Sequence, residues 1–275
     1  MKHGWNGGDQ KHVLLCMAGL SVGLFILLIS WLFIPVDAGR DEASTQQSLA
    51  LQQRMDDWQV MAHYFSTLQL PLQQTILLHR STVQSLEEPL QQKQISTHLQ
   101  NHFPHLHWQS EADQYQMVWQ GFHQESSELG VNRSYEVKLQ LIQQENSERV
   151  TVLFKLQFFP GDQAYIHQVA TEWNGVLGDI HIDPYYFVEL RGTENDWRTN
   201  EEMAQQRQEF QALVEALELS AYEDDNSWVT AYEDAQIQHR LPNHNTRINL
   251  QWMSHRNEET SQIDHKMGTP ILFAE

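Results

Sequence analysis

Apolar residues form one unbroken run near the start of the chain, from Val13 to Ile34. Its 22 residues would extend about 33 Å as a helix, enough to cross a hydrocarbon core of about 30 Å. The run contains no charged residue and predicts a transmembrane helix over residues 13–34, preceded by a short tail over residues 1–12. A cleaved signal peptide ending at Ala38 is the alternative, but its apolar core would be shorter, about 7 to 15 residues.

Residues 36–103 follow a helical pattern. Apolar side chains recur at spacings of three and four between residues 44 and 70, and two further helical pieces are predicted on either side of Pro89. We expect this region to form a helical stalk that pairs with itself or with a partner, or a helical layer packed on the sheet that follows. The first stripe consists of Leu51, Met55, Trp58, Met61, Ala62, Phe65 and Leu68.

In residues 104–275 apolar and polar residues alternate with a period of two, as in β-strands. We expect these residues to form one extracytoplasmic domain. Strands are predicted over residues 115–119, 135–141 and 152–158, with short connections that make them antiparallel. Residues 164–173 fit a strand and a short helix equally well, whereas residues 180–190 indicate a strand with a bulge or an edge at Pro184. Residues 199–219 predict a long helix, and residues 248–252 a closing strand. The predicted fold class is α+β: one N-terminal transmembrane helix, a helical stalk or layer, and an antiparallel sheet packed with at least one long helix.

Charge and cysteine content restrict the partners and the compartment. The chain has 17 basic and 36 acidic residues and a net charge of −19, which disfavours binding to nucleic acid and anionic headgroups. Its single cysteine, Cys16, lies within the apolar run, so the predicted exported part has no disulfide. Lys2 and Lys11 precede the run and Arg40 alone follows it closely, which predicts a bacterial inner-membrane protein with a cytoplasmic N-terminus and a periplasmic domain.

In the order of its parts the chain is similar to the bitopic assembly subunits of bacterial type II secretion and type IV pilus machines. This resemblance implies a scaffold subunit that contacts the lipid bilayer through residues 13–34 and binds other membrane or periplasmic proteins. An anchored sensory or ligand-binding domain is the alternative, followed by a metal-dependent hydrolase. No cysteine nucleophile outside the run, Gly-x-Ser-x-Gly turn or Gly-rich phosphate loop is present, so we expect no enzyme, no catalytic residue and no cofactor.

Two groups of residues have the chemistry of metal ligands. The first contains four imidazoles within ten residues, and two of them have the i, i+4 spacing of one helix face. The alternative is a solvated helix end. These residues are His98, His102, His105 and His107.

The second group is Asp179, His181 and Asp183, which alternate with isoleucines. On a strand the three side chains would share one face, but successive residues on that face are about 6.5 to 7 Å apart and spread. The alternative is the solvated face of a half-buried strand. We therefore expect the purified protein to carry no stoichiometric metal.

An acidic sequence also repeats, as Ala221–Asp224 and Ala231–Asp234. The spacing of its oxygen ligands does not match an EF-hand loop, and the repeat predicts a solvated acidic loop.

Overall fold

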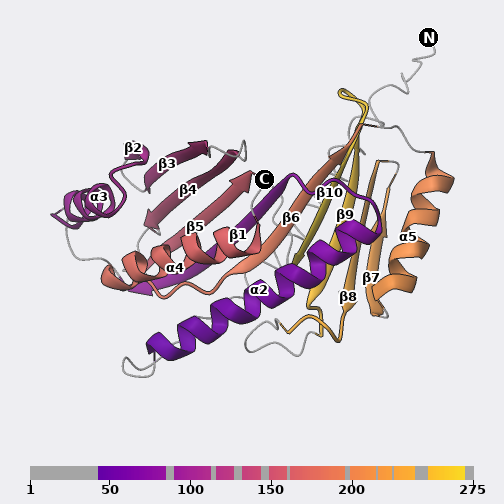
Figure 1. The fold of residues 1–275 in the computed structure, drawn as a ribbon, viewed down its shortest axis with the longest axis horizontal. Coiled ribbons are helices and arrows are strands. Elements are labelled where there is room, and N and C mark those ends of the chain that lie inside the picture. The colour runs from indigo at the N-terminus through magenta and orange to yellow at the C-terminus, as the bar shows by residue number, and fades with distance from the viewer. Residues whose placement is uncertain are drawn as a thin grey trace, which may run out of the picture. The chain divides into compact units, whose positions relative to one another are not determined.

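An antiparallel sheet of ten strands is the main element of the protein, in a computed structural model of the chain (Figure 1). The structure describes residues 43–84, 90–112, 116–126, 132–143, 149–159, 162–195, 199–214, 216–224, 226–238 and 247–269. All of them belong to one unit, Asp37–Leu272. The strand order across the sheet is β2-β3-β4-β5-β1-β6-β10-β9-β8-β7.

Four helices and ten strands make up the described part of the chain. The helices are α2 (Ala43–Thr67), α3 (Leu90–His102), α4 (Gln163–Asp179) and α5 (Asn200–Val214). The strands are β1 (Gln74–Gln84), β2 (His107–Ala112), β3 (Gln116–Ser126), β4 (Asn132–Gln143), β5 (Arg149–Phe159), β6 (Phe187–Glu194), β7 (Leu217–Glu223), β8 (Ser227–Glu233), β9 (Leu250–Asn257) and β10 (Gln262–Thr269).

The order of elements occurs twice along the chain. Helix, strand, helix and four strands follow one another as α2-β1-α3-β2-β3-β4-β5 and again as α4-β6-α5-β7-β8-β9-β10. Within each half the first strand lies beside the last, and β1 pairs with β6 in antiparallel fashion, so that Thr75 faces Leu190 and Leu77 faces Val188. The strand order therefore reads the same from both ends of the sheet, and β2 and β7 occupy equivalent outer edges.

One face of the sheet carries the hydrophobic core. On β4 and β5 the cross-strand pairs Val137–Leu156 and Leu139–Phe154 are buried, whereas the intervening Lys138–Lys155 pair is half-buried on the other face. Side chains of all four helices belong to the same buried cluster as these apolar pairs. The helices therefore cover one face of the sheet, in agreement with the alternating pattern along β4 and β5.

Helix α2 is part of this core and not a stalk. Leu51, Met55 and Phe65 of the predicted stripe are at most 3% exposed. Asp57, which is fully buried, accepts a hydrogen bond from the backbone N–H of Gln238 at 2.7 Å. Helix α2 lies across the sheet (Figure 1) and contacts α4 and β6. The helical layer is the alternative that the structure supports, and the predicted fold class with a helical stalk is wrong.

The predicted second helix of the stalk is strand β1. Strand β1 lies in the middle of the sheet, between β5 and β6, so apolar residues occur on both of its faces. Ile76 and Leu77 point to opposite faces and are both fully buried. A strand that is buried on both faces does not alternate apolar and polar residues, so its apolar positions can match the period of a helix.

No described helix is both long enough and apolar enough to cross a membrane. Helix α2 has 25 residues, but Arg54, Asp56 and Asp57 interrupt its apolar positions. In the described part of the chain this finding contradicts the transmembrane helix of the predicted fold class and the single-pass inner-membrane localisation. The predicted span, residues 13–34, and the tail, residues 1–12, lie outside the described residues.

Candidate functional site

Aromatic packing places the end of α3 against α4. The Phe103 ring, directly after α3, stacks on the Trp173 ring of α4 with centroids 4.1 Å apart and planes 14° apart. The N-cap of helix α4 is Asp162, whose side chain accepts a hydrogen bond from the Tyr165 backbone N–H at 2.9 Å. Residues 164–173, for which the sequence fits a strand and a short helix equally well, therefore belong to helix α4. The last residue of α4 is Asp179.

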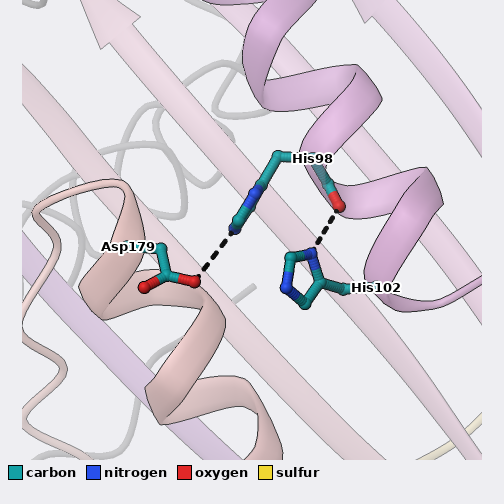
Figure 2. A group of neighbouring side chains, drawn as sticks. All are labelled: His98, His102 and Asp179. Carbon is teal, nitrogen blue, oxygen red and sulfur yellow. Dashed lines mark hydrogen bonds and ion pairs between the residues drawn. The ribbon is translucent and has the colours of Figure 1, made fainter.

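Three of the predicted metal ligands meet where these helices approach each other. His98 and His102 of α3 and Asp179 of α4 each offer a ligand atom, and these atoms all lie within 4.8 Å of one another (Figure 2). The shortest distance from His98 to Asp179 is 3.7 Å, between Nε2 and Oδ2. The two imidazole centroids are 4.2 Å apart. We refer to these three residues as the His–His–Asp triad.

Each member of the triad has a different environment. The side chain of His98 is 24% exposed, and its Nε2 is buried without a hydrogen-bond partner among the described residues. Nδ1 of His102 lies 3.0 Å from the backbone carbonyl oxygen of His98, one helical turn earlier. The Asp179 side chain is 61% exposed. The triad is therefore exposed to solvent at Asp179, whereas Nε2 of His98 is buried.

The remaining predicted ligands lie outside the triad. Nε2 of His105 is 3.4 Å from the hydroxyl of Tyr135, and His107 is exposed at the start of β2. His181 has a φ of 61° in the turn after α4, and Asp183 is exposed in the extended segment that leads to β6. The predicted strand over residues 180–190 begins only at Phe187, so the expected row of three ligands on one strand face does not form.

A second candidate site is the outer edge of β7. Among the described residues five large hydrophobic side chains are exposed, and three of them belong to this seven-residue strand. Leu217, Leu219 and Tyr222 are 56%, 38% and 45% exposed. The equivalent edge strand β2 exposes polar side chains instead, with sequence His-Trp-Gln-Ser-Glu-Ala. The difference between two equivalent edges indicates that β7 has a role beyond completing the sheet.

Helix α5 covers only one face of β7. Its Arg207 forms ion pairs with Glu218 and Glu223 of β7, both at 3.3 Å. Leu217 and Tyr222 face Glu233 and Val229 of β8 across the strands, on the other face. The register shifts between Glu218 and Ser220, so Leu219 lies at an irregularity of the edge.

The edge of β7 does not follow from the predicted elements. The helix predicted over residues 199–219 ends at Val214. The first acidic repeat is the end of β7 and the start of its turn, whereas the second is the end of β8 and is largely buried, so it is not the predicted solvated loop. The alternation in Leu-Glu-Leu-Ser-Ala-Tyr-Glu was the available signal for a strand.

Comparisons with known proteins do not assign a family. No family model and no curated protein matches the chain. Three chains of solved structures match, one of them described as the "di-domain ARO/CYC StfQ from the steffimycin biosynthetic pathway". It shares 10% identity, the match covers 71% of this chain and 85% of that chain, and the TM-score is 0.19. A likeness at that score carries no argument about this protein.

Proposed function

We propose that this protein binds partner proteins, and that the outer edge of β7 pairs with an extended segment of the partner. The supporting observation is the concentration of exposed Leu217, Leu219 and Tyr222 on an edge strand. The proposal retains the protein-binding part of the predicted scaffold role. It does not include the membrane anchor or the stalk.

The edge of β7 has the properties of a strand-addition site. It is the last strand of the sheet and has no strand neighbour on its outer side among the described residues. Backbone N–H and C=O groups on such an edge pair readily with another strand, and natural proteins usually protect them with Lys, Pro or a bulge. The sequence of β7 contains no Lys or Pro, so the irregularity at Leu219 is its one protection of this kind, and apolar side chains on both sides of it are exposed.

Charge specifies the chemistry of the partner. Glu218 and Glu223 of β7 are paired with Arg207, but the whole chain has a net charge of −19. Two copies of a chain with this net charge repel each other, which disfavours pairing between two copies of this chain. We therefore expect an extended partner segment that alternates apolar and basic residues.

The test uses a photo-crosslinking amino acid at Tyr222 of the full chain, expressed in the cells that make the protein. The control position is Leu49 of α2, which is 59% exposed and far from β7 in the sequence. We expect an adduct with another protein from Tyr222 and not from Leu49. A Leu217→Lys/Leu219→Lys variant should weaken the adduct at least about tenfold, because truncation of one anchor at an interface costs about 1–2 kcal/mol.

Three outcomes would contradict the proposal. One is the absence of any adduct from Tyr222. Another is an equal yield from Leu49. The third is an adduct of twice the chain's mass of 32.2 kDa, which would identify a second copy of this chain as the occupant.

A further inference from the structure

We propose that the His–His–Asp triad binds a divalent transition metal ion of the zinc type, which links α3 to the C-terminal end of α4. The ligands are His98 and His102 of α3 and Asp179 of α4. This site goes beyond the partner-binding function and does not depend on it, because the triad lies on α3 and α4 whereas the partner-binding edge is strand β7.

The spacing of the ligands suits one ion. Residues at i and i+4 of a helix share one face, so His98 and His102 project from α3 on the same side. Ligands bind tetrahedral zinc at about 2.0 to 2.2 Å and are therefore about 3.3 to 3.5 Å from one another. The triad atoms lie within 4.8 Å of one another, and Nε2 of His98 is 3.7 Å from Oδ2 of Asp179. Side-chain movements of about 1 Å would bring the three ligand atoms to these distances around one ion.

The hydrogen bond of His102 leaves its other nitrogen ready to bind metal. A backbone carbonyl can only accept, so the contact of Nδ1 with the carbonyl oxygen of His98 requires a proton on Nδ1. In the neutral ring Nε2 then carries a lone pair. Figure 2 shows this second nitrogen on the side of the ring that faces Asp179. Hydrogen bonding of the non-ligating nitrogen to a carbonyl is the usual arrangement for metal-bound histidine.

His98 provides a second indication of a ligand. Its Nε2 is buried and has no hydrogen-bond partner among the described residues, and its contact with Oδ2 of Asp179 at 3.7 Å is a long ion pair and not a hydrogen bond. A buried polar atom without a hydrogen bond costs about 1–3 kcal/mol. A metal ion bound to this lone pair would remove that cost.

The local field also favours a cation. Asp179 is the last residue of α4, so its carboxylate lies at the negative end of the helix dipole. The last turn of α4 has no basic residue. A negative side chain at this end of a helix is unfavourable by itself and becomes favourable beside a bound cation. Three protein ligands leave a fourth coordination position for water.

The test titrates the full chain with Zn²⁺ alone against a chromophoric chelator, and records the Co²⁺ absorption spectrum. The variants His98→Ala, His102→Ala and Asp179→Asn each remove one ligand. The matched control is His107→Gln, from the same histidine cluster but outside the triad. We expect about one equivalent of zinc, an intense tetrahedral Co²⁺ spectrum, and an affinity at least about 100-fold lower in each ligand variant, because loss of an outer-shell partner alone costs 10- to 100-fold.

Hydrogen exchange gives a second measurement that does not depend on the variants. Zinc should slow amide exchange at the C-terminal end of α3, because the ion ties it to α4. Helix α5, which occupies the equivalent position in the second half and contains no histidine, should be unaffected.

The proposal is wrong if the chain binds no zinc at micromolar concentration. It is also wrong if His107→Gln lowers the affinity as much as the ligand variants, or if zinc slows exchange equally in α3 and α5.

Discussion

Burial of His79 makes a specific prediction about acid stability. His79 lies on β1 and is 3% exposed. Its Nδ1 is 2.8 Å from the backbone nitrogen of Tyr185 and 3.3 Å from the carbonyl oxygen of the same residue. The shorter contact is a hydrogen bond from the Tyr185 N–H to an unprotonated Nδ1. The proton of the neutral ring is then on Nε2, which donates to Oγ of Ser81 at 2.9 Å.

The magnitude follows from the pKa of this ring. Burial lowers the pKa of His79 from its ordinary value of 6.5 to about 4, and the carbonyl oxygen of Tyr185, which can accept from a protonated ring, opposes this shift in part. In the unfolded chain His79 takes up a proton near pH 6.5, whereas the folded protein takes it up only near pH 4. The contribution of neutral His79 to the free energy of unfolding is therefore complete above pH 6.5 and is lost as the pH falls towards 4. Between pH 7 and pH 4.5 this loss is about 2 to 2.5 kcal/mol.

The perturbation is His79→Gln, whose amide can accept from the Tyr185 N–H and donate to Ser81 without titrating. Urea unfolding at pH 7 and pH 4.5 measures the free energy of unfolding of both proteins. The wild type should lose about 2 to 2.5 kcal/mol more than the variant over this range.

A second variant, His79→Leu, separates titration from packing. It should differ from His79→Gln in stability at pH 7 but show the same reduced dependence on pH. If the wild type and both variants lose stability in parallel between pH 7 and pH 4.5, the reasoning about His79 is refuted.

Further predictions concern backbone contacts, and urea unfolding measures each of them. An added Cβ at Gly192 would lie 2.0 Å from the carbonyl oxygen of Pro71, so Gly192→Ala should destabilise the fold by about 2–3 kcal/mol. Gly175 has nothing within 4 Å of an added Cβ in a helix, so Gly175→Ala should stabilise it by about 0.5–1 kcal/mol, and a loss of stability there would contradict the structure of α4. Asn249 is fully buried and hydrogen-bonds three backbone groups of residues 234–237, so Asn249→Ala should cost about 3 kcal/mol, and a cost below about 1 kcal/mol would show that this turn is satisfied by other groups.

The strands that the sequence predicted share one property. Strands β3, β4 and β5 have helices on one face only, so their side chains alternate and period two is visible. Strand β1 is buried on both faces and gives no such pattern. The duplication was hidden for the same reason, because it becomes apparent only when β1 and β6 are recognised as equivalent first strands of the two halves.

The candidate metal site shows where local sequence information ends. The i, i+4 spacing of His98 and His102 is a local property that the sequence itself shows. The sequence pattern assigns Asp179 to a different group, on a predicted strand. Its approach to α3 depends on packing between distant segments, such as the stacking of Phe103 on Trp173. Spacing along the chain cannot predict that contact.

The duplicated fold provides a criterion for function that single-copy folds lack. A feature that the fold itself requires should occur in both halves, since both have the same order of strands and helices. The buried face of the sheet meets this condition, and so do the helices that cover it. The histidine pair occurs on α3 and not on α5, and the exposed apolar side chains occur on β7 and not on β2. Because neither feature is needed to build its half, selection for binding is the simpler reason for each.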